Sequence, residues 1–486
     1  MPTEDKSQIR NLLDNETNTS VKSRISKNNN TKKYINQNGK QEENVSNLEE
    51  ENKKDKFSLP SKQFSIRESY ILQLFEQNRT IKSIYNILVA NYILFIFAFT
   101  LKEYMNHQRL PKALLVIPRS FGKMHLVAMV WLGNNFATFS TYYFFLLWGK
   151  TRQKVIFQKL WDILWILLLI TYYIMSFVVI TKVVFALNLP FASAIIITME
   201  SVRFLMKVHA FVRHNAPKML HNSGDKTADD CLSFSKFLYF LYIPTIIYRD
   251  QYPRLKTIRW GFVFYRLLEI ANIIIFLAYW YEYVITPYFK DTCLKTWSAL
   301  EVFLLFLEFS IPAYLIIFVM FFTVLHSIQN AVGELLRFGD RLFYADWWNC
   351  TNVQQYYRKW NLVIGDWLYT YIYKDMYEII VPGNRNLGKI ITVLISALVH
   401  EWICTVCSGY FLPLHIPLMS FSTICMYVFR VKEYTTASNI VYIIMIMLGT
   451  NIIITFYAFE HFTRLNFPSN KQFVSLFWTS NCVSLQ

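Results

Sequence analysis

Long apolar stretches recur along the chain from about residue 83 to about residue 460, and short polar segments separate them. Many approach the ~20 residues that an α-helix needs to cross ~30 Å of hydrocarbon. A soluble core does not need such runs. The pattern predicts an all-α, multi-pass membrane protein with about nine transmembrane helices, at roughly 83–101, 124–148, 160–181, 190–206, 262–284, 299–326, 388–411, 413–429 and 438–459.

The two predicted spans 388–411 and 413–429 meet at Pro413. Proline has no backbone N–H to donate within a helix, so it marks either a kink or a tight turn between spans. Both alternatives remain open from the sequence, and a count of eight or ten spans is compatible with the pattern.

Composition agrees with a membrane protein, because 54% of the residues are hydrophobic and only 17% are charged. The formal net charge is +16, yet charges of opposite sign nearly cancel in residues 1–60. The basic excess therefore belongs to the loops between the spans. Such a distribution suits anionic lipid and an anionic co-substrate better than a nucleic acid, and no nucleic-acid partner is predicted.

Residues 1–60 are rich in Asn, Lys, Glu and Ser and contain no apolar core of the kind that a signal peptide has. They are predicted to form a disordered cytosolic tail, followed by one membrane domain over residues 61–486. Lys and Arg are frequent in 209–260, which places that loop and the amino terminus in the cytosol, although the basic residues of 102–123 argue for the other side.

The seven cysteines do not form a disulfide framework. Four lie in or beside predicted spans, namely Cys350, Cys404, Cys407 and Cys425. Only Cys293 and Cys482 occupy positions suited to an oxidising lumen.

Between about 328 and 386 the apolar pattern breaks, and a long aromatic and charged segment appears. Such residues are typical of the membrane interface or of a buried site in which their polar ends find partners. The next span carries His400 and Glu401 about halfway along its length. Ionisable groups at membrane depth usually face a polar cavity.

A neutral imidazole can take a proton from an alcohol, which makes His400 a candidate general base. The alternative is a histidine that only hydrogen-bonds between helices, and His326, one turn before Asn330, has the same two interpretations. A zinc-protease helix would require a second histidine at position 404, where Cys404 stands. With no nucleophile elbow, Walker loop or paired CxxC either, no metal and no cofactor are predicted.

From about residue 64 to 465 the chain resembles the sterol O-acyltransferases, within the membrane-bound O-acyltransferase superfamily. The resemblance rests on the run Tyr356–Asn361, on Ser396 followed by His400 and Glu401, and on a signature of the form FYxDWWN. That signature comprises Phe343, Tyr344, Asp346, Trp347, Trp348 and Asn349.

The resemblance implies transfer of a fatty acyl group from acyl-coenzyme A to the hydroxyl of a sterol, giving a steryl ester and coenzyme A. His400 would be the base and Asn361 its partner, in a reaction chamber enclosed by the spans. Contacts with acyl-coenzyme A are implied for Tyr357, Arg358, Trp360, Tyr373, Arg385 and Ser396. It further implies a homodimer or homotetramer in the endoplasmic reticulum membrane.

The run 244–254 favours the sterol branch over the diacylglycerol branch, but diacylglycerol or a fatty alcohol remains an alternative acceptor. A transporter, in which His400 and Glu401 relay protons or ions, is the alternative of another class. Two positions depart from the family: Gly365 stands where a second histidine is common, and Trp402 where a tyrosine is.

Overall fold

The computed structural model describes residues 59–221, 232–292, 297–428 and 434–466, and within these ranges every named element is a helix. Outside the described residues lie most of the predicted tail, up to residue 58, and the two cysteines Cys293 and Cys482. The part before residue 300 contains α3 (Tyr70–Gln77), α4 (Arg79–His107), α5 (Ala113–Ser120), α6 (Met124–Arg152), α7 (Gln158–Ala186), α8 (Phe191–His221), α10 (Phe234–Tyr242), α11 (Trp260–Trp280), η2 (Tyr281–Ile285) and α12 (Thr286–Phe289).

The remaining part alternates long helices with short ones. It contains α13 (Ala299–Glu308), α14 (Ser310–Phe321), η3 (Phe322–Ile328), α15 (Gln329–Leu335), η4 (Trp347–Asn349), α16 (Val353–Lys359), α17 (Leu362–Leu368), η5 (Tyr369–Tyr373), η6 (Met376–Ile380), α18 (Arg385–Ser408), α19 (His415–Val428) and α20 (Thr436–Asn466). The short ones, α16 to η6, occupy the segment in which the apolar pattern breaks, which explains why no span was predicted there.

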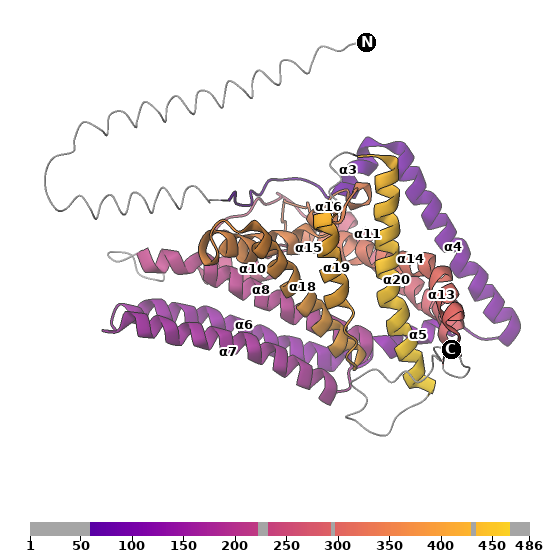
Figure 1. Cartoon of the computed structure of the whole chain (residues 1–486), viewed down its shortest axis with the longest axis horizontal. Helices are drawn as coiled ribbons and strands as arrows, with labels where there is room; N and C mark the ends of the chain where they lie inside the picture. Colours follow the sequence, from indigo (N-terminus) through magenta and orange to yellow (C-terminus); the bar gives the residue numbers. More distant parts are fainter. Residues whose placement is uncertain (1–58, 222–231, 293–296, 429–433, 467–486) are drawn as a thin grey trace, which may run out of the picture. The chain divides into compact units, whose positions relative to one another are not determined.

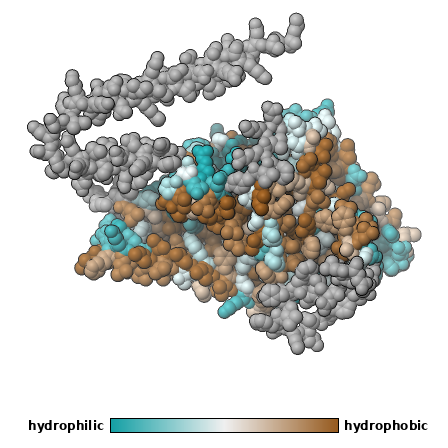
Figure 2. Space-filling view, in the orientation of Figure 1, coloured by the Kyte–Doolittle hydropathy of each residue, from teal (hydrophilic) through white to brown (hydrophobic). Residues whose placement is uncertain are grey.

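Seven helices of the described residues are long and apolar enough to cross a membrane, so the multi-pass prediction is confirmed but the count of nine is not. They cover Arg79–His107, Ala113–Arg152, Gln158–Ala186, Trp260–Phe289, Ser310–Leu335, Arg385–Ser408 and Thr436–Asn466. Large apolar side chains on several of them are exposed, including those of Leu94 and Phe97 on α4. Figure 2 shows hydrophobic surface over these helices, which suits contact with lipid tails.

The predicted span 190–206 lies in α8, which is not apolar enough to be one of the seven. Two of its charged residues donate hydrogen bonds to carbonyls at the end of the neighbouring α10. The buried Lys207 ammonium donates to the carbonyls of Phe240 and Ile243, and the Arg203 guanidinium donates to that of Leu241. Cations stabilise the carboxyl end of a helix because its last carbonyls lack partners, which gives these charges a structural reason.

The predicted span 413–429 corresponds to α19, whose 14 residues extend about 21 Å at 1.5 Å per residue, too short to cross ~30 Å of hydrocarbon. Helix α18 ends at Gly409, which has a φ of 81°. Residues 409–414, including Pro413, are not helical, so the proline lies in a turn between two helices rather than in a kink.

Packing places α8 and α18 at the centre of one group of helices. Helix α8 contacts α6, α7 and α18, and α18 also contacts α19 and η5. A second group joins α11 to η3 and α15, and α14 to α20 (Figure 1). The short helices of the predicted site segment therefore contact both α18 and α19.

The segment that precedes α3 is bound to the loop around Gly339, which is bound in turn to the loop around Pro253. The backbone N–H of Arg67 donates to Gly339 O at 2.9 Å, and that of Gly339 donates to Pro253 O at 2.8 Å. A Cβ at Gly339 would lie 3.0 Å from that same Pro253 oxygen, so a side chain would push the loops apart. An ion pair between Arg67 and Asp340 at 2.7 Å completes the attachment.

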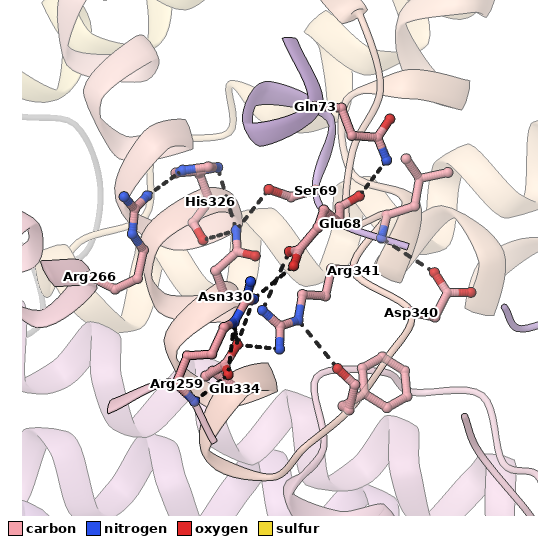
Figure 3. A network of polar contacts seen from close by, with 12 residues as sticks. Glu68, Ser69, Gln73, Arg259, Arg266, His326, Asn330, Glu334, Asp340 and Arg341 are labelled. Atoms are coloured by element: carbon pink, nitrogen blue, oxygen red, sulfur yellow. Dashed lines mark hydrogen bonds and ion pairs between the residues drawn. The ribbon is translucent and has the colours of Figure 1, made fainter. Parts of the chain in front are cut away.

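Beside this segment lies a buried network of ionic contacts (Figure 3). The Glu334 carboxylate, with no exposed surface, pairs with the guanidinium of Arg341 at 2.6 Å and with that of Arg259 at 2.9 Å. Glu68 pairs with Arg259 at 2.7 Å. The network thus joins α15, the start of α11, and the segments before α3 and before the FYxDWWN signature.

We expect deletion of residues 1–55 to leave the fold intact, because their composition cannot bury enough apolar surface to form a core. Deletion of residues 1–69 should instead destabilise the protein, since it also removes Arg67 and Glu68. Thermal unfolding of both truncations in detergent checks this. Equal melting temperatures for the two would contradict it.

Replacing Arg341 by Met should lower the free energy of unfolding by about 3 kcal/mol, because it leaves the buried Glu334 carboxylate without its shortest ion pair. The matched control is Arg337→Met, which removes an exposed guanidinium of the same segment and should cost less than about 0.5 kcal/mol. Denaturation of both variants measures the difference, and similar losses would argue against a structural role for the network.

Candidate active site

His400 lies on α18, one turn after Ser396, and its ring is exposed although α18 is apolar enough to cross a membrane. Its Nδ1 lies 2.7 Å from the backbone oxygen of Ser396. A carbonyl oxygen can only accept a hydrogen bond, so Nδ1 carries the proton of the neutral ring. The lone pair of Nε2 is therefore the one that can take a proton from a substrate.

Glu401, the next residue, is buried and has a structural contact. One of its carboxylate oxygens accepts hydrogen bonds from the backbone N–H groups of His415 at 2.8 Å and Ile416 at 3.2 Å. These N–H groups begin α19 and have no partner within the helix. Glu401 thus connects α18 to the start of α19, and its contacts are not those of an ion pathway.

Asn361 is the residue that begins α17. Its side-chain oxygen accepts the backbone N–H of Ile364 at 3.1 Å, as asparagine commonly does at this helix position. With the oxygen occupied, the amide group offers its two N–H donors. Donors of this kind suit an oxygen that develops negative charge.

The structure does not bring Asn361 and His400 into hydrogen-bond contact with each other. The helices that carry these two residues are connected through η5, which follows α17 directly in the chain and packs on α18. Gly365, one of the two positions that depart from the expected pattern, lies within α17.

Several residues predicted to contact acyl-coenzyme A make contacts between neighbouring helices. The hydroxyl of Tyr357 on α16 is 2.8 Å from that of Ser422 on α19. Burial raises the pKa of Tyr357, so its phenol stays neutral and can still donate a hydrogen bond. Trp360 packs against Phe321 and Trp347, with ring centroids 5.1 and 4.8 Å apart, and belongs to the core as much as to a binding surface.

Three tyrosines form a stacked column that leads to Arg385. The rings of Tyr369 and Tyr373 are 5.8 Å apart, those of Tyr373 and Tyr377 are 6.1 Å apart, and the Arg385 guanidinium lies 5.6 Å from the Tyr377 centroid. The Tyr373 ring packs on Gly388, where a Cβ would approach it to 3.1 Å. Both Arg385 and Arg358 are exposed, so their charges are available to an anionic ligand.

The FYxDWWN signature is mostly internal packing. Phe343, Tyr344 and Trp347 are buried, and the hydroxyl of Tyr442 on α20 donates to the Trp347 carbonyl at 2.9 Å. Asn439 donates to the carbonyls of Trp348 and Cys350. The Asp346 carboxylate pairs with Lys359 at 3.0 Å, so the signature holds α16 and α20 in place.

His326 is fully buried on η3, between the Arg266 guanidinium at 2.6 Å and the Tyr344 hydroxyl. Asn330, one turn further, donates to the His326 carbonyl. These contacts are those of a histidine satisfied by its neighbours. Of its two interpretations, the structural one fits the geometry.

Sequence reasoning did not single out His415, whose ring lies beside that of His400, nor the tyrosine column. The column has a sequence signal, since Tyr369, Tyr373 and Tyr377 recur every four residues. His415 has none, because a turn separates it from α18. Among the described residues, no group of three or more His, Cys, Asp or Glu side chains is placed to hold a metal ion.

The fold and the site define the class: a multi-pass α-helical membrane protein with an accessible imidazole on an apolar helix. Comparison with known proteins identifies the family, because the sequence profile of the membrane-bound O-acyltransferase family matches residues 113–459. The chain belongs to this family and is a membrane O-acyltransferase, and the transporter alternative has no such support.

Two relatives confirm the resemblance to sterol O-acyltransferases. Sterol O-acyltransferase 1 of Mus musculus is 35% identical over 410 residues, which cover 83% of this chain and 76% of that protein. Sterol O-acyltransferase 2 of Homo sapiens is 30% identical over 411 residues, which cover 84% and 77%.

If Arg358 and Arg385 bind the phosphates of acyl-coenzyme A, replacing either by Ala should raise the apparent KM for this substrate several-fold, because a charge-assisted contact is lost. The KM for the acceptor should change less. Arg119→Ala, which removes an exposed arginine at the end of α5, is the control. Unchanged acyl-coenzyme A kinetics in both site variants would show that these arginines only anchor the interface.

Proposed function

We propose that this enzyme transfers a fatty acyl group from acyl-coenzyme A to the hydroxyl of a sterol, with His400 as general base. The observation that carries the proposal is the contact of His400 Nδ1 with the Ser396 carbonyl, which leaves the Nε2 lone pair as the proton acceptor. The sterol O-acyltransferases among the relatives support the substrate class.

The reaction needs one proton acceptor and one donor. The acceptor oxygen attacks the thioester carbonyl carbon as its proton moves to His400 Nε2, and the carbon–sulfur bond then breaks. The coenzyme A thiolate takes the proton back from the imidazolium, so atoms and charges balance. Neither a covalent acyl-enzyme nor a metal is required.

Asn361 would act on the negative charge that develops on the carbonyl oxygen. Its side-chain oxygen already caps α17, which fixes the orientation of the amide and leaves its N–H donors free for this purpose. A donor aimed before the reaction begins costs no reorganisation in the transition state. Asn361 and His400 do not hydrogen-bond to each other, so each would meet the substrate from its own helix.

Acyl-coenzyme A would place its phosphates near the two exposed arginines, Arg358 and Arg385. Tyr357, Trp360, Tyr373 and Ser396 would line the path of the acyl chain toward His400. The acceptor would reach the exposed face of His400 laterally from the bilayer, within a chamber enclosed by the spans.

Diacylglycerol or a long-chain alcohol remains the second candidate acceptor. The run 244–254 that favours the sterol branch is held by internal contacts, such as the hydrogen bond from Tyr252 to the Ile247 carbonyl and the packing of Arg254 on Tyr239. The run therefore has a structural role and no shown contact with an acceptor. The choice of a sterol rests on the similarity to sterol O-acyltransferases. Incubation of purified enzyme with labelled oleoyl-coenzyme A and a panel of sterols, diacylglycerol and fatty alcohols decides between these acceptors.

The proposal includes an endoplasmic reticulum location, a cytosolic amino terminus and a homodimer or homotetramer. The concentration of Lys and Arg in 209–260 supports the orientation. Protease protection of microsomes tests the orientation, and mass measurement of detergent-solubilised protein tests the assembly.

We expect His400→Ala to lower turnover by roughly 10²–10⁴-fold, which is the usual contribution of a positioned general base. Folding and acyl-coenzyme A binding should persist, because within the described part of the chain the side chain of His400 hydrogen-bonds only to the backbone of its own helix. Single-turnover kinetics with purified protein measure the effect.

The control is His326→Ala, which removes a fully buried ring and should lower stability first. A His400→Ala enzyme that esterifies lipid alcohols at the wild-type rate would rule out His400 as the base.

A further inference from the structure

A second histidine lies next to the proposed base. The ring of His415, the first residue of α19, is 6.0 Å from the ring of His400 between centroids, and the two planes differ by only 24°. The two rings are therefore nearly parallel, in the manner of stacked aromatic side chains. This pair is formed across the turn between α18 and α19.

A polar side chain lies at each edge of the His415 ring. Its backbone N–H donates to Glu401, and its Nδ1 lies 3.9 Å from the other oxygen of the same carboxylate. Its Nε2 lies 3.8 Å from the Cys404 sulfur, within reach of a thiol hydrogen bond. Since His415 is only 9% exposed, its nitrogens face protein groups, and it presents a ring face to His400.

We propose that His415 is a positioning residue for His400: its ring packs against the imidazole and holds it in the plane in which Nε2 meets the acceptor hydroxyl. The inference rests on the proposed function, because it gives His415 a role only through His400. His415 is not a second base, because both of its nitrogens are turned toward Glu401 and Cys404.

The arrangement explains a feature of Glu401 that capping alone does not. Its second oxygen is buried and has no hydrogen-bond partner among the described residues, and the same is true of His415 Nδ1. A small rotation of either side chain would join them. Glu401 therefore fixes the backbone of His415, and its second oxygen lies close enough to receive a hydrogen bond from the ring after that rotation.

The His415 ring contacts His400 on a side chain that has few other restraints on its orientation. Among the residues that the structure describes, the His400 side chain hydrogen-bonds only to its own helix backbone, which fixes one ring nitrogen but leaves the exposed ring able to rotate about that contact. His415 provides an aromatic neighbour from another helix.

The test compares His415→Ala with His415→Phe, which keeps a flat ring without nitrogens. We expect His415→Ala to lower kcat about tenfold with an unchanged KM for oleoyl-coenzyme A, because misorientation of a catalytic group lowers turnover. His415→Phe should stay within about twofold of wild type. His461→Ala, which removes a histidine of α20, is the control and should keep full activity.

Epistasis separates a positioning role from a general structural one. In a His400→Ala background, adding His415→Ala should cause no further loss, because a residue that acts through another has nothing left to position. Where His415→Ala does not fold, His415→Leu replaces it, since leucine fills the space without a flat ring and should be as slow.

Three results would overturn the inference: wild-type kcat in His415→Ala, a His415→Phe enzyme as slow as the Ala or Leu variant, or additive losses in the double variant. Each is distinguishable from failure of the proposed function. That failure appears as full activity of the His400→Ala enzyme, whatever His415 does.

Discussion

The ion pair between Glu334 and Arg341 is the contact on which the arrangement of the site segment depends. Both side chains are almost completely buried, so neither charge can be left without the other. Arg341 begins the chain segment that runs into the FYxDWWN signature, and Glu334 lies at the end of a membrane helix. The pair therefore fixes where the signature leaves the membrane helices. Glu68 and Arg259 come from two other segments and join the same network of ion pairs. Four separate segments of the chain therefore meet at this point.

The two proposed catalytic groups share a constraint of the same kind. Each commits one polar atom to the backbone and leaves the other for substrate: Asn361 uses its oxygen as a helix cap, and His400 uses Nδ1 on the Ser396 carbonyl. The free atoms are then an N–H donor and a lone pair, which are what an oxyanion and an alcohol proton require. The fold thus decides the chemistry each group can offer, before any substrate is bound.

Much of this was predictable from the sequence and the rest was not, for physical reasons. Apolar runs locate most membrane helices because hydrocarbon demands ~20 apolar residues, and His400 stands out as an ionisable group within one. Helix α8 was wrongly predicted to span the membrane because its first residues are apolar. Lys207, further along the helix, instead donates hydrogen bonds to carbonyls at the end of α10. Glu68 and Glu334 are 266 positions apart in sequence yet share Arg259, and no local pattern encodes such a pairing. The stack of His415 on His400 depends in the same way on a turn whose geometry the sequence does not specify.

Most of the FYxDWWN signature is buried, whereas several of the residues proposed to act on substrate are exposed, and Trp360 packs on Trp347 where the two sets meet. Phe343, Tyr344 and Trp347 are buried among other aromatic rings, so their contribution is to internal packing. His400, Arg358 and Arg385 are exposed. A change of acceptor can therefore arise around His400 without disturbing the signature. His415, which supplies a ring from a different helix, is one such position.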